Sequence, residues 1–109
     1  MKGTYLGEFE ELVLLLVGVI QGNAYTVTLK EEIIRRTGRK PSIGALHSAL
    51  TRLEKKGFLK TEIGHGTEDR GGRRKKLYLT TTEGREALKR SHDLRHDLFE
   101  EFQKIYSLG

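Results

Sequence analysis

Apolar side chains are packed so densely near the start of the chain that they cannot all lie on one side of a helix. They fall within residues 6–22, behind three acidic residues, Glu8, Glu10 and Glu11. The β-branched content would also suit a strand, but the length and the leading acids favour a helix, whose N-terminal end attracts negative charge. The pattern predicts a helix over residues 6–22, ended by Gly22-Asn23 and buried on more than one side.

Two shorter amphipathic segments follow. The first begins at Thr28, which forms a capping-box pattern with Glu31, and stops at Gly38. The second begins after Pro41-Ser42, with Ser42 as its N-cap, and ends at Gly57. Their apolar stripes are Leu29, Ile33 and Ile34 in the first segment and Leu46, Ala49, Leu50 and Leu53 in the second. Two helices joined by a short turn, the second with a polar and basic outer face, predict a helix-turn-helix.

The rest of the chain predicts a hairpin and one long helix. Alternating residues over 58–63 and 76–80 indicate two strands, and the turn between them is rich in glycine and arginine. A helix of roughly 27 residues, about 40 Å long, runs from Thr81 to about Ser107. Its N-cap is either Thr80 or Thr81.

This order of elements predicts an α+β fold. Three helices and a two-stranded wing form a winged helix-turn-helix over residues 1–80, which would bind DNA. Residues 81–109 form a long C-terminal dimerisation helix that packs with the helix of residues 6–22.

Charge is segregated along the chain. The net charge is +5 overall, yet the stretch from Arg35 to Lys76 carries +9 and the remainder −4. An ordinary solvated surface would also be charged, but here the basic stretch coincides with the predicted helix-turn-helix and wing. A basic centre between acidic ends is typical of a nucleic-acid-binding protein with separate oligomerisation elements.

Other classes of chemistry find little support. The chain has no cysteine, so disulfides are excluded, and no apolar run is long enough to span a bilayer. His92 and His96 have metal-ligand spacing, but without further ligands they indicate a solvated helix face. No nucleophile or phosphate-cradling motif is present, so we expect no enzyme, no cofactor, no metal and no membrane association, and a cytoplasmic location.

Three motifs in the right order resemble the PadR family of winged-helix repressors, in its short subfamily, over essentially the whole chain. They are Ala24-Tyr25, the stretch from Leu46 to Leu59, and the stretch from Arg73 to Gly84. The sequence departs from the family pattern at Val27, at His47 (usually Tyr) and at Thr80 (usually Leu). The resemblance implies promoter binding and a dimer in which the C-terminal helix contacts the partner's first helix. In some members it also implies a flat apolar ligand at the dimer centre, held in some short members between tryptophans, of which this chain has none.

Candidate DNA contacts lie on the second helix of the helix-turn-helix, in the turn before it and on the wing. We expect Arg52 to read a guanine, Lys55 and Lys56 to contact phosphates, and the wing arginines to enter a minor groove. The full predicted set is Arg39, Lys40, Ser42, Gly44, Ala45, His47, Ser48, Thr51, Arg52, Lys55, Arg70, Arg73, Arg74 and Lys75.

Candidate dimer contacts lie on the first and last helices, where one chain of 109 residues cannot cover all the apolar surface. They are Phe9, Leu12, Val13, Leu16, Leu88, Leu94, Leu98, Phe99, Phe102, Ile105 and Tyr106.

The sequence thus predicts a homodimeric, sequence-specific regulator of transcription, a repressor at a palindromic promoter site on double-stranded DNA. One alternative is a winged-helix module that binds protein or RNA within a larger assembly. Another is a sensor in which Phe9, Phe99, Phe102 and Tyr106 enclose a small apolar effector at the dimer centre.

Overall fold

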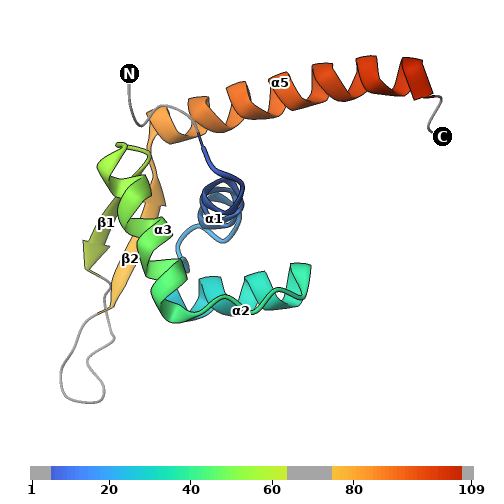
Figure 1. Cartoon of the computed structure of the whole chain (residues 1–109). Coiled ribbons are helices and arrows are strands. Elements are labelled where there is room, and N and C mark those ends of the chain that lie inside the picture. Colours follow the sequence, from blue (N-terminus) through green and yellow to red (C-terminus); the bar gives the residue numbers. More distant parts are fainter. Residues whose placement is uncertain (1–5, 64–74, 107–109) are drawn as a thin grey trace.

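Four helices and a two-stranded antiparallel sheet form an α+β winged helix-turn-helix with a long C-terminal helix (Figure 1). The computed structural model describes residues 6–63 and 75–106. In chain order the elements are α1 (Glu8–Val19), α2 (Thr26–Thr37), α3 (Ile43–Lys55), β1 (Leu59–Ile63), β2 (Lys76–Thr80) and α5 (Thr82–Tyr106). The predicted fold class is confirmed.

The first helix, α1, is the element around which the others pack. It contacts α2, α3, β2 and α5, and Figure 1 shows it at the centre of the molecule. Its predicted burial on more than one side is confirmed, although it is shorter than residues 6–22 because the chain turns at Ile20. Val13 and Leu16 were predicted as dimer contacts, and this was wrong. Both are almost fully buried inside their own chain, because the surrounding elements already cover that part of α1.

The second helix begins three residues earlier than the Thr28 capping box predicted. Its N-cap is Tyr25, and Thr28 stands at the third helical position. The Thr28 hydroxyl accepts a hydrogen bond from the Tyr25 N–H at 2.9 Å and donates to the Asn23 carbonyl at 2.5 Å. Thr28 therefore satisfies the N-cap N–H from the third helical position, as the glutamate of a capping box would.

The predicted limits of α3 are confirmed. The Ser42 hydroxyl accepts from the Ala45 N–H at 3.0 Å, as an N-cap does, and the chain reverses at Gly57 with a φ of 82°. Gly38 ends α2 in the same left-handed conformation, with a φ of 76°. The apolar stripe of α3, which consists of Leu46, Ala49, Leu50 and Leu53, is wholly buried.

The two strands of the wing pair antiparallel, with Leu59 opposite Thr80 and Ile63 opposite Lys76. The first strand starts one residue later than predicted, after Phe58, whose N–H bonds back to the end of α3. The Tyr78 N–H on the free edge of β2 donates to the Ala24 carbonyl at 2.9 Å. This bond fixes the wing to the segment just ahead of α2.

The start of α5 is locked onto the junction between α3 and β1. Thr81 is its N-cap, because its hydroxyl accepts from the Gly84 N–H at 3.0 Å and donates to the Gly57 carbonyl at 2.6 Å. The Thr81 N–H also donates to the Phe58 carbonyl at 3.1 Å. Gly84 is buried directly over that peptide. The first turns of α5 are therefore fixed to the winged helix.

Beyond these turns, α5 leaves the body of the molecule. Ala87 is buried and Leu88 is half-buried, whereas Figure 1 shows the second half of the helix extending past the other elements. That half carries a series of exposed apolar side chains: Leu94, Leu98, Phe99, Phe102, Ile105 and Tyr106.

The packing at Gly84 predicts that Gly84→Ala strongly destabilises the protein. A Cβ there would lie 3.1 Å from the Cα and carbonyl carbon of Phe58 and closer still to its carbonyl oxygen. We expect a loss of about 1–3 kcal/mol or more in the free energy of unfolding, measured by urea titration.

Gly18→Ala is the matched control. A Cβ at Gly18 would meet Thr80 Cγ2 at an ordinary 3.7 Å, and alanine favours a helix over glycine by roughly 0.5–1 kcal/mol. A Gly84→Ala protein as stable as the Gly18→Ala protein would contradict the close packing of α5 on Phe58.

Candidate nucleic-acid interface

The centre of the outward face of α3 is small and polar. Gly44, Ser48, Thr51 and Lys55 are exposed and follow the spacing of one helix face, opposite the buried stripe. Such side chains allow the helix backbone to approach a base-pair edge closely and to hydrogen-bond there. The structure therefore brings these four predicted residues together on one surface, the α3 face.

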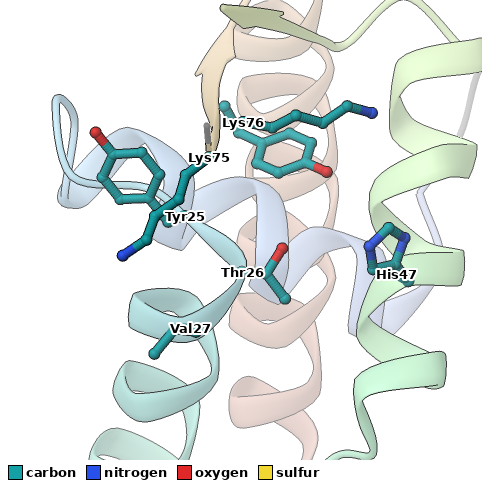
Figure 2. A pocket seen from close by; sticks show the side chains of 7 residues that line it. Tyr25, Thr26, Val27, His47, Lys75 and Lys76 are labelled. Carbon is teal, nitrogen blue, oxygen red and sulfur yellow. The ribbon is translucent and has the colours of Figure 1, made fainter. Parts of the chain in front are cut away.

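The wing lies along one edge of the α3 face. A pocket of about 350 Å³ separates α3 from the start of α2 and the base of the wing. Figure 2 shows Tyr25 and Lys75 on one side of it, His47 on the other, and Thr26 between them. Its lining is Tyr25, Thr26, Val27, His47, Lys75, Lys76 and Tyr78.

The chemistry of this pocket is basic and aromatic. The Lys75 ammonium lies 5.7 Å from the centre of the Tyr25 ring, within the range of a cation–π contact. Burial raises the pKa of Tyr78, and the negative charge of Glu54 adds to this, while a hydrogen bond with Thr26 opposes it. Tyr78 is therefore a neutral phenol, and the charge of the pocket comes from its lysines.

The N-terminus of α1 lies along the other edge of the α3 face. Arg39, in the turn before α3, pairs with Glu8 at 2.7 Å and stacks on the Phe9 ring at 5.2 Å. Phe9, Arg39, Lys40, Pro41 and Ala45 line a second, more open pocket of about 280 Å³. Arg39 and Lys40 are exposed beside the start of α3, as a role in binding phosphate would require.

A buried carboxylate joins α1 to α3. Glu10 is only 5% exposed. Its Oε2 accepts from Arg52 Nε at 2.6 Å, and its Oε1 accepts from Lys56 Nζ at 2.6 Å and from the Gly7 N–H at 3.1 Å. Arg52 keeps 52% of its side chain exposed, but Lys56 keeps only 18%. Lys56, which we expected to contact phosphate, instead lies largely beneath the surface.

These contacts set the charge state of Glu10. Burial alone would raise the pKa of this carboxyl, but hydrogen bonds from Lys56, Arg52 and the Gly7 N–H outweigh it and hold the pKa below its usual value. Glu10 is therefore ionised under ordinary conditions, and the cluster of one carboxylate and two cations carries a net charge of +1.

The sequence indicated that the residues of the α3 face are exposed, but it did not indicate Glu10 or the pocket beside the wing. Glu10 was read as one of three acids that suit a helix N-terminus. Its distance of three and seven residues from Val13 and Val17 puts it on the buried side of α1, and that spacing was the available signal. The pocket brings together residues from α2, α3 and the wing, and no local pattern marks it. Arg70, Arg73 and Arg74 lie outside the described residues.

The histidines on α5 have a simple arrangement. The rings of His92 and His96 stack at 5.9 Å, and His96 lies 3.1 Å from Glu100 on the exposed helix surface. Within residues 6–63 and 75–106, no group of three or more His, Cys, Asp or Glu side chains is arranged to hold a metal ion. The same part of the chain contains no helix long and apolar enough to cross a membrane.

Comparison with known proteins gives one consistent result. The family profile described as "Transcriptional regulator PadR-like family" matches residues 13–90. A transcriptional regulator from Clostridium thermocellum is similar in structure, with 26% sequence identity, a TM-score of 0.68, and coverage of 87% of this chain and 86% of that one.

Two further solved structures have the same fold. A PadR family regulator from Eggerthella lenta is 25% identical, with a TM-score of 0.70 and coverage of 94% and 88%. Another from Clostridium difficile is 20% identical, with a TM-score of 0.71 and coverage of 94% and 100%. No curated protein matches the sequence.

The ionised Glu10 predicts a specific loss of stability in acid. Because its pKa is lower in the folded protein than the usual 4.5, Glu10 favours folding above that pH, and the contribution is lost as the pH falls through the folded-state pKa. Urea titrations from neutral to acidic pH should show a smaller acid-induced loss of stability in Glu10→Gln than in the unmodified protein.

Glu32→Gln is the control. The pKa of Glu32 is lowered to about 2 by hydrogen bonds from Arg35 and Arg36, but these pairs lie on the surface, where salt screens them. High salt should abolish the effect of Glu32→Gln and leave that of Glu10→Gln. Identical acid sensitivity of Glu10→Gln and the unmodified protein would show that Glu10 is not ionised in a buried cluster.

Proposed function

Because this chain belongs to the PadR-like family of transcriptional regulators, we propose that it binds palindromic promoter DNA in a sequence-specific manner, as a homodimer, and represses transcription there. The α3 face carries the proposal: it is exposed, polar at its centre and basic at both edges. Bound across a promoter, the dimer would compete with RNA polymerase.

The dimensions and chemistry of α3 suit the major groove. A helix fits that groove with its N-terminal half against the base edges, and Ser48 and Thr51 can donate to or accept from any base. Arg52, at the edge toward α1, has the guanidinium that pairs with guanine. Arg39, Lys40 and Lys75 lie around this surface and Lys55 lies on it, and all four supply cations for the phosphates. The wing arginines Arg70, Arg73 and Arg74 are proposed to extend the basic surface, from sequence alone.

The proposed dimer rests on the exposed apolar surface of α5. Six large apolar side chains are 45–72% exposed over its second half. The Phe102 ring stacks on Phe99 at 6.1 Å and lies tilted against Tyr106 at 4.7 Å. On α1, Leu15 and Val19 are 47% and 59% exposed, and Leu12 is half-buried. A second copy placed with its α1 against this α5 would cover both surfaces, and two-fold symmetry would then present two α3 faces to DNA.

The proposed recognition of DNA predicts different roles for Arg52 and Lys55. The probe is a duplex recovered by selection from a random-sequence pool, compared with a scrambled duplex of the same composition. Arg52→Ala should weaken binding to the selected duplex by about 1–3 kcal/mol more than binding to the scrambled one. Lys55→Ala should weaken both equally and lower the salt dependence of binding by about two units for a dimer, one per protomer.

Lys104→Ala is the control, since this substitution removes the same charge from α5, away from α3. Selection that recovers no preferred duplex would refute sequence-specific binding, and preference for a structured RNA over every duplex would favour an RNA-binding module. A recovered motif without two-fold symmetry would refute the palindromic site.

The proposed dimer predicts that Leu98→Asp yields a monomer. Leu98 is 55% exposed in the single chain, and a carboxylate in the middle of an apolar interface is strongly unfavourable. Sedimentation velocity should show a dimer for the unmodified protein and a monomer with the same circular dichroism for the variant. Asp97→Ala, which changes the neighbouring residue outside the apolar series, should remain a dimer. A folded monomer of the unmodified protein at micromolar concentration would contradict the proposed assembly.

A further inference from the structure

Within the described residues, the only hydrogen bond or ion pair that joins the Arg52 side chain to another element is with Glu10. The ion pair engages Nε at 2.6 Å, while half of the side chain stays exposed. A guanidinium is planar, and fixing Nε restricts the direction in which its two terminal amino groups point. Those are the groups that a guanine edge accepts from. Glu10 therefore determines where α3 presents its arginine.

Stability alone gives little reason for this cluster. A buried ion pair contributes little net stability compared with apolar side chains of similar size, because both charges lose their hydration. The other buried residues of α1 are apolar, so a further apolar residue would fit the pattern of the helix. What the carboxylate adds is a fixed direction for the side chains that bind it.

Lys56 makes this arrangement compatible with DNA binding. A carboxylate paired with one arginine alone would cancel the charge of that arginine, and the neutral pair would not attract a polyanion. The largely buried Lys56 supplies the second cation, so the cluster keeps a charge of +1 at the surface, where Arg52 is exposed. Lys56 thus neutralises the charge of Glu10, while Glu10 orients the Arg52 side chain.

We infer that Glu10 is a positioning residue for DNA recognition, which holds the exposed Arg52 guanidinium in the direction needed to read a base. This inference rests on the proposed function. Without Glu10, Arg52 would be free to adopt other rotamers and would bind phosphates of any sequence more readily. Loss of the carboxylate should therefore reduce the preference among sequences without weakening DNA binding in general.

The test compares Glu10→Gln with the unmodified protein on the selected and scrambled duplexes, by fluorescence anisotropy. The ratio of the two affinities should fall by between about fivefold and a hundredfold, the range of one arginine–guanine contact. Affinity for the scrambled duplex should be unchanged or higher, since a negative charge has been removed. A residue needed only for folding would instead lower both affinities together.

Glu11→Gln is the matched control. Glu11 is the next residue on the same helix, and the substitution changes the charge equally. Its carboxylate, however, faces α5, where it accepts from Ser91 at 2.8 Å and lies 3.7 Å from Arg95. We expect the affinity ratio of Glu11→Gln to equal that of the unmodified protein.

Combining the substitutions shows whether Glu10 acts through Arg52. In the Arg52→Ala background, Glu10→Gln should leave the affinity ratio unchanged, because no guanidinium remains to be positioned. A further fall of the same size there, an unchanged ratio in the single variant, or an equal fall in Glu11→Gln would each overturn the inference.

Three further outcomes are informative. If Glu10→Gln does not fold, Glu10→Asp keeps the charge and shortens the side chain by one methylene, so a lower affinity ratio would support positioning and an unchanged ratio would overturn it. If the unmodified protein has no preferred duplex, both the proposed function and this inference fail. If Arg52→Ala lowers the ratio but Glu10 variants do not, the proposed function stands and only this inference fails.

Discussion

The architecture depends on the burial of α1. Its apolar residues are too many for one helix face, and the chain covers them by placing α2, α3, β2 and α5 around the helix. Each of these elements has an apolar stripe of its own, and Leu29, Ile33, Leu46, Leu50, Tyr78 and Ala87 meet in one core. Since burial of apolar surface is the main favourable term in folding, α1 orients the recognition helix, the wing and the C-terminal helix at once.

Polar contacts make this packing directional. Two apolar surfaces can shift slightly against each other without losing contact, whereas hydrogen bonds and ion pairs fix the relative position of two elements at a few points. At one end, Thr81 and Gly84 lock α5 to the peptide of Phe58. Ahead of α2, the bond from Tyr78 to Ala24 ties the wing to the helix-turn-helix. At the N-terminus of α1, Glu10 contacts α3 while the adjacent Glu11 contacts α5. The two surfaces with proposed functions are thus attached to neighbouring residues of one helix.

The same constraint explains why the structure has two unlike exposed regions. The α3 face is small, polar and basic because α3 buries only its opposite side. The second half of α5 is apolar yet exposed, because the helix extends past the other elements of its own chain (Figure 1). A polar, basic surface suits a polyanion, and an apolar one suits another copy of the chain. The arrangement thus separates the proposed DNA contacts from the proposed dimer contacts.

The sequence by itself determined the elements, because periodicity, caps and glycines act locally. It predicted the helix-turn-helix, the limits of α3 and β2, and the exposed side of α3 represented by Ser48 and Thr51. It could not decide which apolar residues of α1 serve the core, since Val13 and Leu16 differ from Leu15 only in what lies opposite them. Nor could it decide between Thr80 and Thr81 as a cap, or find that Glu10 meets Arg52, 42 residues away. Such pairings arise only when helices distant in sequence pack together, and only tertiary structure could decide them.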